Sequence, residues 1–64
     1  MLFAEALDRW RFAMRLYWPE DEVDAAIRAA VDRRKHDGGL RPLTSYLDEY
    51  RDLAKQGRRP FEIV

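Results

Sequence analysis

The sequence of 64 residues contains no cysteine, and this absence excludes several kinds of stabilisation and chemistry. No disulfide can hold the fold together, and neither a thiolate zinc site nor a cysteine nucleophile can be built. A chain this short buries only about 60% of its unfolded surface on folding. Its stability must therefore come from efficient helix packing, from an oligomer or from a partner protein.

Residues that perform catalysis or bind metal ions are also scarce. His36 is the one histidine, and Thr44 and Ser45 are the only serine or threonine residues. Asp32 precedes His36 by one helical turn and Asp37 follows it, but two or three such ligands do not complete a tetrahedral site. A charged helix end explains them better. With no phosphate-binding glycine loop or nucleophile motif, we expect no enzyme activity, cofactor, metal site or small-molecule substrate.

Twelve basic and twelve acidic residues leave no net charge, so long-range attraction to nucleic acid or anionic lipid is not built into the total. The distribution is uneven, because residues 1–32 sum to −3 and residues 33–64 to +3. No apolar run approaches the roughly 20 residues needed to span a bilayer, and no signal-peptide pattern opens the chain. We expect a soluble cytoplasmic protein without membrane contact.

Bulky apolar residues, including both tryptophans, are concentrated in the first 18 residues. At 100° per residue they fill one continuous arc of about 160°, which predicts a helix over residues 2–18 with more apolar surface than one neighbouring helix covers. The arc contains Leu2, Phe3, Ala6, Leu7, Trp10, Ala13, Met14, Tyr17 and Trp18. We expect Trp10 and Trp18 to be core residues.

Two apolar residues of this segment depart from the arc. Phe12 and Leu16, spaced four apart, lie among the charged residues Arg9, Arg11 and Arg15. An aromatic and a leucine one turn apart can form the centre of a helix-in-groove contact, with arginines as its polar rim. The alternative is that another part of the chain packs over them and makes them core, and the sequence leaves both interpretations open.

Two further helices are predicted, over residues 20–36 and 43–56. Pro19 ends the first helix and favours the start of the second, whose opening acids suit the helix dipole. The basic run before Gly38 and Gly39 predicts the end of this helix, and Gly57 the end of the third. The fold class is therefore all-α, a compact three-helix bundle over residues 1–57 with short loops and an apolar C-terminal tail over residues 58–64.

The tail has two interpretations. Phe61, Ile63 and Val64 are too apolar for an idle terminus. They either pack back over the open end of the bundle or extend along a partner, adding a strand to an exposed edge. The sequence does not separate these interpretations.

Taken together, these patterns favour a small helical protein-binding module of the kind common among bacterial and phage accessory proteins. It would act as an accessory subunit of a larger assembly or as a small inhibitor or regulator. The predicted partner-binding residues are Phe12, Leu16, Arg9, Arg11, Arg15, Phe61 and Ile63.

Two alternative functions remain. One is a helix-turn-helix DNA-binding regulator with Arg33, Arg34, Lys35 and Arg41 on the phosphates. Asp48, Glu49 and Asp52 on its recognition helix would repel DNA, which makes this the weaker hypothesis. The other is a homo-oligomeric structural protein, in which a second copy closes the wide apolar arc.

Overall fold

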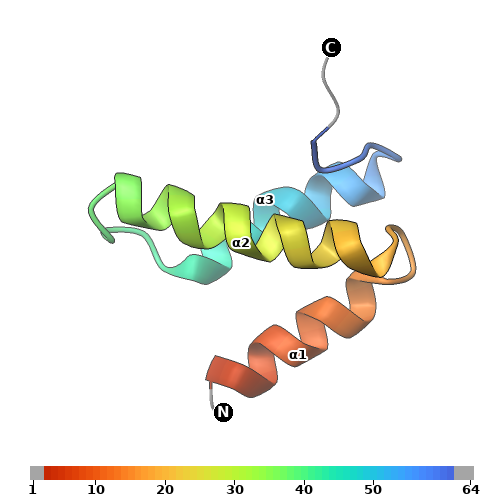
Figure 1. Ribbon diagram of the computed structural model, residues 1–64, viewed down its shortest axis with the longest axis horizontal. Coiled ribbons are helices and arrows are strands. Elements are labelled where there is room, and N and C mark those ends of the chain that lie inside the picture. Colours follow the sequence, from red (N-terminus) through yellow and green to blue (C-terminus); the bar gives the residue numbers. More distant parts are fainter. Residues whose placement is uncertain (1–2, 62–64) are drawn as a thin grey trace.

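The computed structural model describes residues 3–61, which fold into three α-helices joined by two short connections. α1 spans Phe3–Met14, α2 spans Glu20–His36 and α3 spans Leu43–Lys55. α2 runs opposite to α1 and α3, so the α1–α2 corner and the α2–α3 loop lie at opposite ends of α2 (Figure 1). The molecule is flat, with principal extents of 30 × 29 × 18 Å. The predicted all-α three-helix bundle is confirmed.

Proline marks the start of both later helices. Pro19 and Pro42 are N-cap residues with extended backbone, at ψ 154° and 150°. Their carbonyls accept the first helical hydrogen bonds, from the Val23 and Ser45 amides at 3.1 and 3.0 Å. Proline lacks the N–H that a helix interior must donate, so it fits at a helix start, where the amide has no helical partner. The predicted starts at residues 20 and 43 are confirmed.

Glycine in the left-handed region ends α2 and α3 in the same way. Gly38 has φ +82° and Gly57 has φ +78°. After α3, the Gly57 amide bonds to the Ala54 carbonyl at 3.0 Å and the Arg58 amide to the Leu53 carbonyl at 3.0 Å. This pair of bonds is the Schellman motif, which satisfies the last carbonyls of a helix. The predicted glycine stops are confirmed, with α3 ending at Lys55, one residue before the expected boundary.

The prediction for the end of the first helix is wrong by four residues. The α-helix ends at Met14, and the amides of Leu16 and Tyr17 bond three residues back, to Ala13 and Met14, at 3.3 and 3.0 Å. Such bonds tighten the last turn of a helix. Pro19 explains the early exit, because it excludes Trp18 from the α region and the chain must already turn toward α2. Leu16 and Tyr17 therefore leave the helical register.

The core lies between all three helices, and α2 supplies its small residues while α1 and α3 supply the large ones. Both tryptophans are buried, as predicted, and each indole N–H has a partner. Trp10 donates to the Leu47 carbonyl at 3.2 Å and Trp18 to the Arg58 carbonyl at 2.8 Å. The buried residues are Trp10, Met14, Trp18, Val23, Ala26, Ile27, Ala30, Leu43, Tyr46, Leu47, Tyr50 and Ala54.

None of the three helices, within residues 3–61, is long and apolar enough to cross a membrane.

Candidate protein-binding surface

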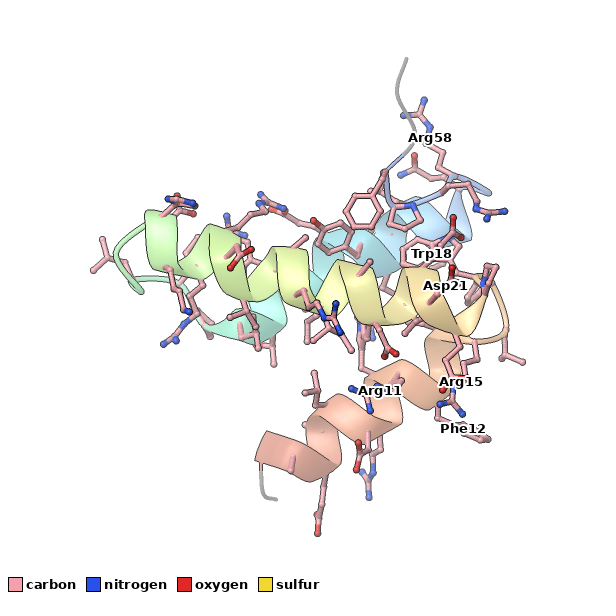
Figure 2. The ribbon with its side chains drawn as sticks, viewed as in Figure 1. Arg11, Phe12, Arg15, Trp18, Asp21 and Arg58 are labelled. Carbon is pink, nitrogen blue, oxygen red and sulfur yellow. The ribbon has the colours of Figure 1, made fainter. Side chains whose placement is uncertain are left out.

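Phe12 and Leu16 lie on the surface at the corner between α1 and α2. Phe12 is 76% exposed and Leu16 is 85% exposed. In Figure 2 the Phe12 side chain points away from α2 and into solvent. Neither α3 nor the segment up to Phe61 covers them, so the interpretation that they are core residues is wrong. Their exposure is what the docking interpretation requires.

The exposed apolar surface is larger than the sequence predicts. The helical wheel places Tyr17 in the apolar arc, but this residue is 49% exposed. Ala13, from the same arc, is exposed as well. For Tyr17 the reason is that the wheel assumes a constant 100° per residue, which fails once the helix ends at Met14, whereas Ala13 lies within α1 near the edge of the arc. Phe12, Leu16 and Tyr17 together form what we name the corner patch; Leu2, at the other end of the predicted arc, lies outside the described residues.

Buried residues hold the corner patch in place. Met14 is fully buried and Trp18 is 3% exposed, and these two residues flank Leu16 and Tyr17 in the sequence. The Trp18 amide also bonds to the Met14 carbonyl at 3.0 Å. Because its flanking residues are fixed in the core, the patch is presented in one backbone conformation, which reduces the entropy cost of binding.

Two of the three predicted rim arginines are engaged in ion pairs within the chain. Arg15 contacts Glu20 at 2.8 Å, and the Arg11 Nε atom lies 3.3 Å from the Asp24 carboxylate. Arg11 therefore joins α1 to α2, and Arg15 closes the connection between them. Arg9 is exposed, and no ion pair or hydrogen bond of its side chain is found among the described residues. Of the predicted rim, Arg9 is the residue most available to a partner.

The start of the tail packs back on the bundle. The Arg58 carbonyl accepts the Trp18 indole N–H, and Arg59 contacts Glu22 at 2.6 Å. The Phe61 ring lies 6.4 Å from the Tyr50 ring, centroid to centroid, at a tilt of 57°. Phe61 nevertheless keeps 50% of its surface exposed. Packing back is thus observed as far as Phe61, whereas the predictions for Ile63 and Val64 lie outside the described residues.

Arg33 and Arg41, proposed for phosphate contacts, converge instead on Glu49 of α3. Their guanidinium groups lie 2.8 and 3.0 Å from the two carboxylate oxygens of Glu49. Hydrogen bonds from Arg41 and then Arg33 hold the pKa of Glu49 below its ordinary value. The same contact with Glu49 raises the pKa of Arg33. Both guanidinium groups also lie over the Tyr46 ring, at 4.9 and 4.3 Å from its centroid.

Tyr46 fixes the loop between α2 and α3. Its ring is fully buried, and its hydroxyl donates a hydrogen bond to the Asp37 carboxylate at the end of α2. This bond and burial both raise the pKa of the Tyr46 hydroxyl. Sequence reasoning missed this arrangement, because a tyrosine at a core position of α3 gives no signal of a partner nine residues earlier.

The remaining basic residues do not gather on one surface. The Arg34 Nε atom donates to the Arg41 carbonyl at 3.2 Å, while Lys35 is exposed in the last turn of α2. Lys55 and Arg58 lie at the opposite end of α3, about 20 Å away for a helix of 13 residues. With Arg33 and Arg41 already paired to Glu49, these positions do not support the helix-turn-helix interpretation.

Two surface hollows complete the geometry. A small hollow of about 60 Å³ between α1 and α3 is lined by Ala6, Leu7, Trp10, Thr44, Leu47 and Asp48. A wider groove of about 540 Å³ lies where the last turns of α2 meet the start of α3, lined by Val31, Arg34, Pro42, Leu43 and Thr44. Across residues 3–61, no group of three or more histidine, aspartate or glutamate side chains is placed to hold a metal ion.

No protein-family model, no curated protein and no solved structure matches this chain.

Proposed function

We propose that this protein is a small protein-binding module, an accessory subunit of a larger assembly or a small inhibitor, which docks through the corner patch. The observation that supports this proposal is the exposure of Phe12 at 76% and of Leu16 at 85% in a chain whose tryptophans are both buried. A chain of 64 residues has few large apolar side chains to place. Leaving these two in solvent costs solubility without helping the fold.

The size of the patch fits the centre of an interface. An aromatic side chain buries about 150–250 Å², so Phe12, Leu16 and Tyr17 together expose on the order of 400 Å². The largest apolar patch on an ordinary monomer is about 300–600 Å² and is frequently functional. A stable interface buries about 800 Å² on each partner, so the corner patch supplies its core and the surrounding polar residues supply the rim.

The chemistry of the patch specifies the partner surface. Phe12 stands out from a helix end, and such a convex aromatic anchor requires an apolar concavity in the other protein. Glu5, Asp8 and Arg9 are exposed on the same side of α1, so the rim of that concavity must meet both signs of charge. Phe61, half exposed in the segment after α3, is a secondary contact.

The test removes apolar area without adding charge. In the variant Phe12→Ser/Leu16→Ser, both changes are at exposed positions, so the circular dichroism and the thermal midpoint should stay close to those of the parent. Affinity for a partner isolated from the native host and identified by mass spectrometry should fall by about 30-fold or more, the usual loss at a binding hot spot.

The matched control is Ala4→Ser/Ala13→Ser, which adds the same two hydroxyls at exposed positions of α1 but keeps the patch. It should bind like the parent protein. If Phe12→Ser/Leu16→Ser binds the purified partner unchanged, the corner patch is not the docking surface.

A further inference from the structure

The segment that follows α3, residues 58–61, lies at the same end of the bundle as the corner between α1 and α2 (Figure 1). We name this segment the strap. Arg58, Arg59 and Phe61 are exposed, and Pro60 is partly buried. A segment that buries so little of itself belongs to the parts of a fold that open locally while the core stays closed.

Two side-chain contacts fasten the strap to α2 and α3, and both are only partly shielded from solvent. Arg59 lies 2.6 Å from the Glu22 carboxylate in the first turn of α2. The Phe61 ring lies 6.4 Å from the Tyr50 ring of α3 and stays half exposed. Because ion pairs near solvent and half-buried rings each contribute little, opening the strap costs less than unfolding a helix.

A third contact joins the strap to the corner. The indole N–H of Trp18 donates to the Arg58 carbonyl at 2.8 Å, so this edge of the buried Trp18 ring faces the strap. When the strap opens, the N–H loses its acceptor and the edge of the ring meets water. Trp18 is therefore a core residue whose burial depends on a segment of low stability.

Trp18 in turn fixes two residues of the corner patch. Leu16 and Tyr17 follow the end of α1 in a tight turn whose amides bond three residues back, with poorer geometry than in an α-helix. Met14 before this turn and Trp18 after it anchor the turn in the core. Loss of one anchor gives the backbone of Leu16 and Tyr17 other conformations to occupy, which raises the entropy cost of docking.

From these contacts we infer that the strap is a conformational switch for docking: the corner patch binds its partner while the strap is closed, and opening the strap weakens that binding. The inference rests on the proposed function, because it concerns control of the same surface. The closed strap and the docked partner favour the same arrangement of Trp18, so each stabilises the other. The exposed Arg15–Glu20 pair also spans the corner, at 2.8 Å, but a pair of this kind adds too little to replace Trp18.

Hydrogen exchange of the free protein measures this coupling without a partner. The strap variant Arg59→Ser/Phe61→Ser removes two exposed side chains that fasten the strap, so circular dichroism should show the helices intact. The amides of Leu16, Tyr17 and Trp18 should then exchange severalfold faster than in the wild type, because their turn has lost one of its anchors.

The reference is the opposite end of α2, where the amides of Asp37 and Gly39 bond to carbonyls of the last helical turns. These amides should exchange at nearly their wild-type rates. Equal acceleration at both ends would mean that the strap adds only to global stability, and the coupling would be wrong. An unchanged rate at the corner amides would refute it as well.

The matched control is Lys35→Ser/Leu40→Ser. Like the strap variant, it removes one cation and one large apolar side chain from exposed positions, but it does so at the α2–α3 end of the fold. It should leave exchange at the corner amides unchanged. Faster exchange there would show that any loss of exposed side chains loosens the corner, which would remove the special role of the strap.

Binding separates this inference from the proposed function. The strap variant should bind the partner purified from the native host severalfold more weakly than the wild type. If the patch variant Phe12→Ser/Leu16→Ser loses the partner while the strap variant binds normally, the switch is wrong and the docking surface stands. If the strap variant binds weakly but its corner exchange is unchanged, Phe61 contacts the partner directly and the switch is again wrong. If both variants bind like the wild type, both proposals are wrong.

Discussion

The indole N–H of Trp18 donates a hydrogen bond of 2.8 Å to the backbone carbonyl of Arg58, joining positions 40 residues apart in the sequence. Trp18 closes the connection between α1 and α2, and Arg58 follows α3, so this bond ties the first corner of the fold to the end of the third helix (Figure 2). Trp18 directly follows Tyr17 of the corner patch in the sequence. The position of Leu16 and Tyr17 therefore depends on a contact with the far end of the chain.

Replacement of Trp18 by phenylalanine removes this donor and part of a buried ring. We expect the free energy of unfolding to fall by about 2–4 kcal/mol, from an unsatisfied carbonyl and a partly emptied site. Urea denaturation measures this loss. Hydrogen exchange should also become faster at the amides of residues 58, 59 and 61.

Trp10→Phe is the matched control, because it removes the other buried indole, whose acceptor Leu47 lies within α3. It should destabilise the bundle without a selective effect on residues 58–61. Equal exchange in the two variants would mean that Trp18 does not anchor the segment after α3.

Gly57→Ala tests the conformation that ends α3. A Cβ atom at Gly57 meets nothing within 4 Å, so the cost arises from the backbone alone, at φ +78°. A left-handed residue with a side chain costs about 1–2 kcal/mol. For a domain of this size each 1 kcal/mol lowers the thermal midpoint by about 4–8 °C, which calorimetry detects. Gln56→Ala, one residue earlier and at φ −82°, should leave the midpoint nearly unchanged.

Glu49→Gln should make stability less dependent on acid pH. The folded-state pKa of Glu49 is depressed by Arg41 and Arg33, so its contribution is present above the ordinary glutamate pKa and is lost as the pH falls through the lower folded value. At neutral pH the loss in the variant should be on the order of 1 kcal/mol, since the pairs are nearly half exposed.

Urea midpoints at pH 7 and below about pH 4 measure this difference, which should shrink in acid. Asp52→Asn removes an exposed carboxylate from the same helix and serves as the control. A difference that stays constant or grows in acid would contradict the assignment to Glu49.

The elements that the sequence predicts well are those with local chemical causes. Pro19 and Pro42 place the helix starts, and Gly38 and Gly57 place the stops, because each acts through its own backbone. The burial of both tryptophans follows from the dominant helical periodicity. These features require no knowledge of which segments meet in space.

The features that could not be predicted depend on how the helices meet. The wheel assigns Tyr17 to the core, whereas the chain leaves the helix at Met14 and exposes it. The sequence predicts that Arg11 faces solvent as a rim residue. In the structure Asp24, 13 positions later, lies beside it, and nothing along the chain indicates this contact. The groove is formed by residues from two helices and their loop, and no pattern along the chain signals it.

The pair of Arg11 and Asp24 provides the last test, a double-mutant cycle across the α1–α2 contact. The Arg11 Nε and the Asp24 Oδ1 atoms are shielded from solvent at 3.3 Å, although the side chains remain 36% and 43% exposed and the geometry is not that of a hydrogen bond. Arg11→Met and Asp24→Ala should each leave one shielded polar atom without its counterpart. The double variant should therefore be less destabilised than the sum of the two, with a coupling of about 0.5–1 kcal/mol in urea denaturation. Strict additivity would mean that the pair holds α1 by packing alone, through the apolar part of the Arg11 side chain.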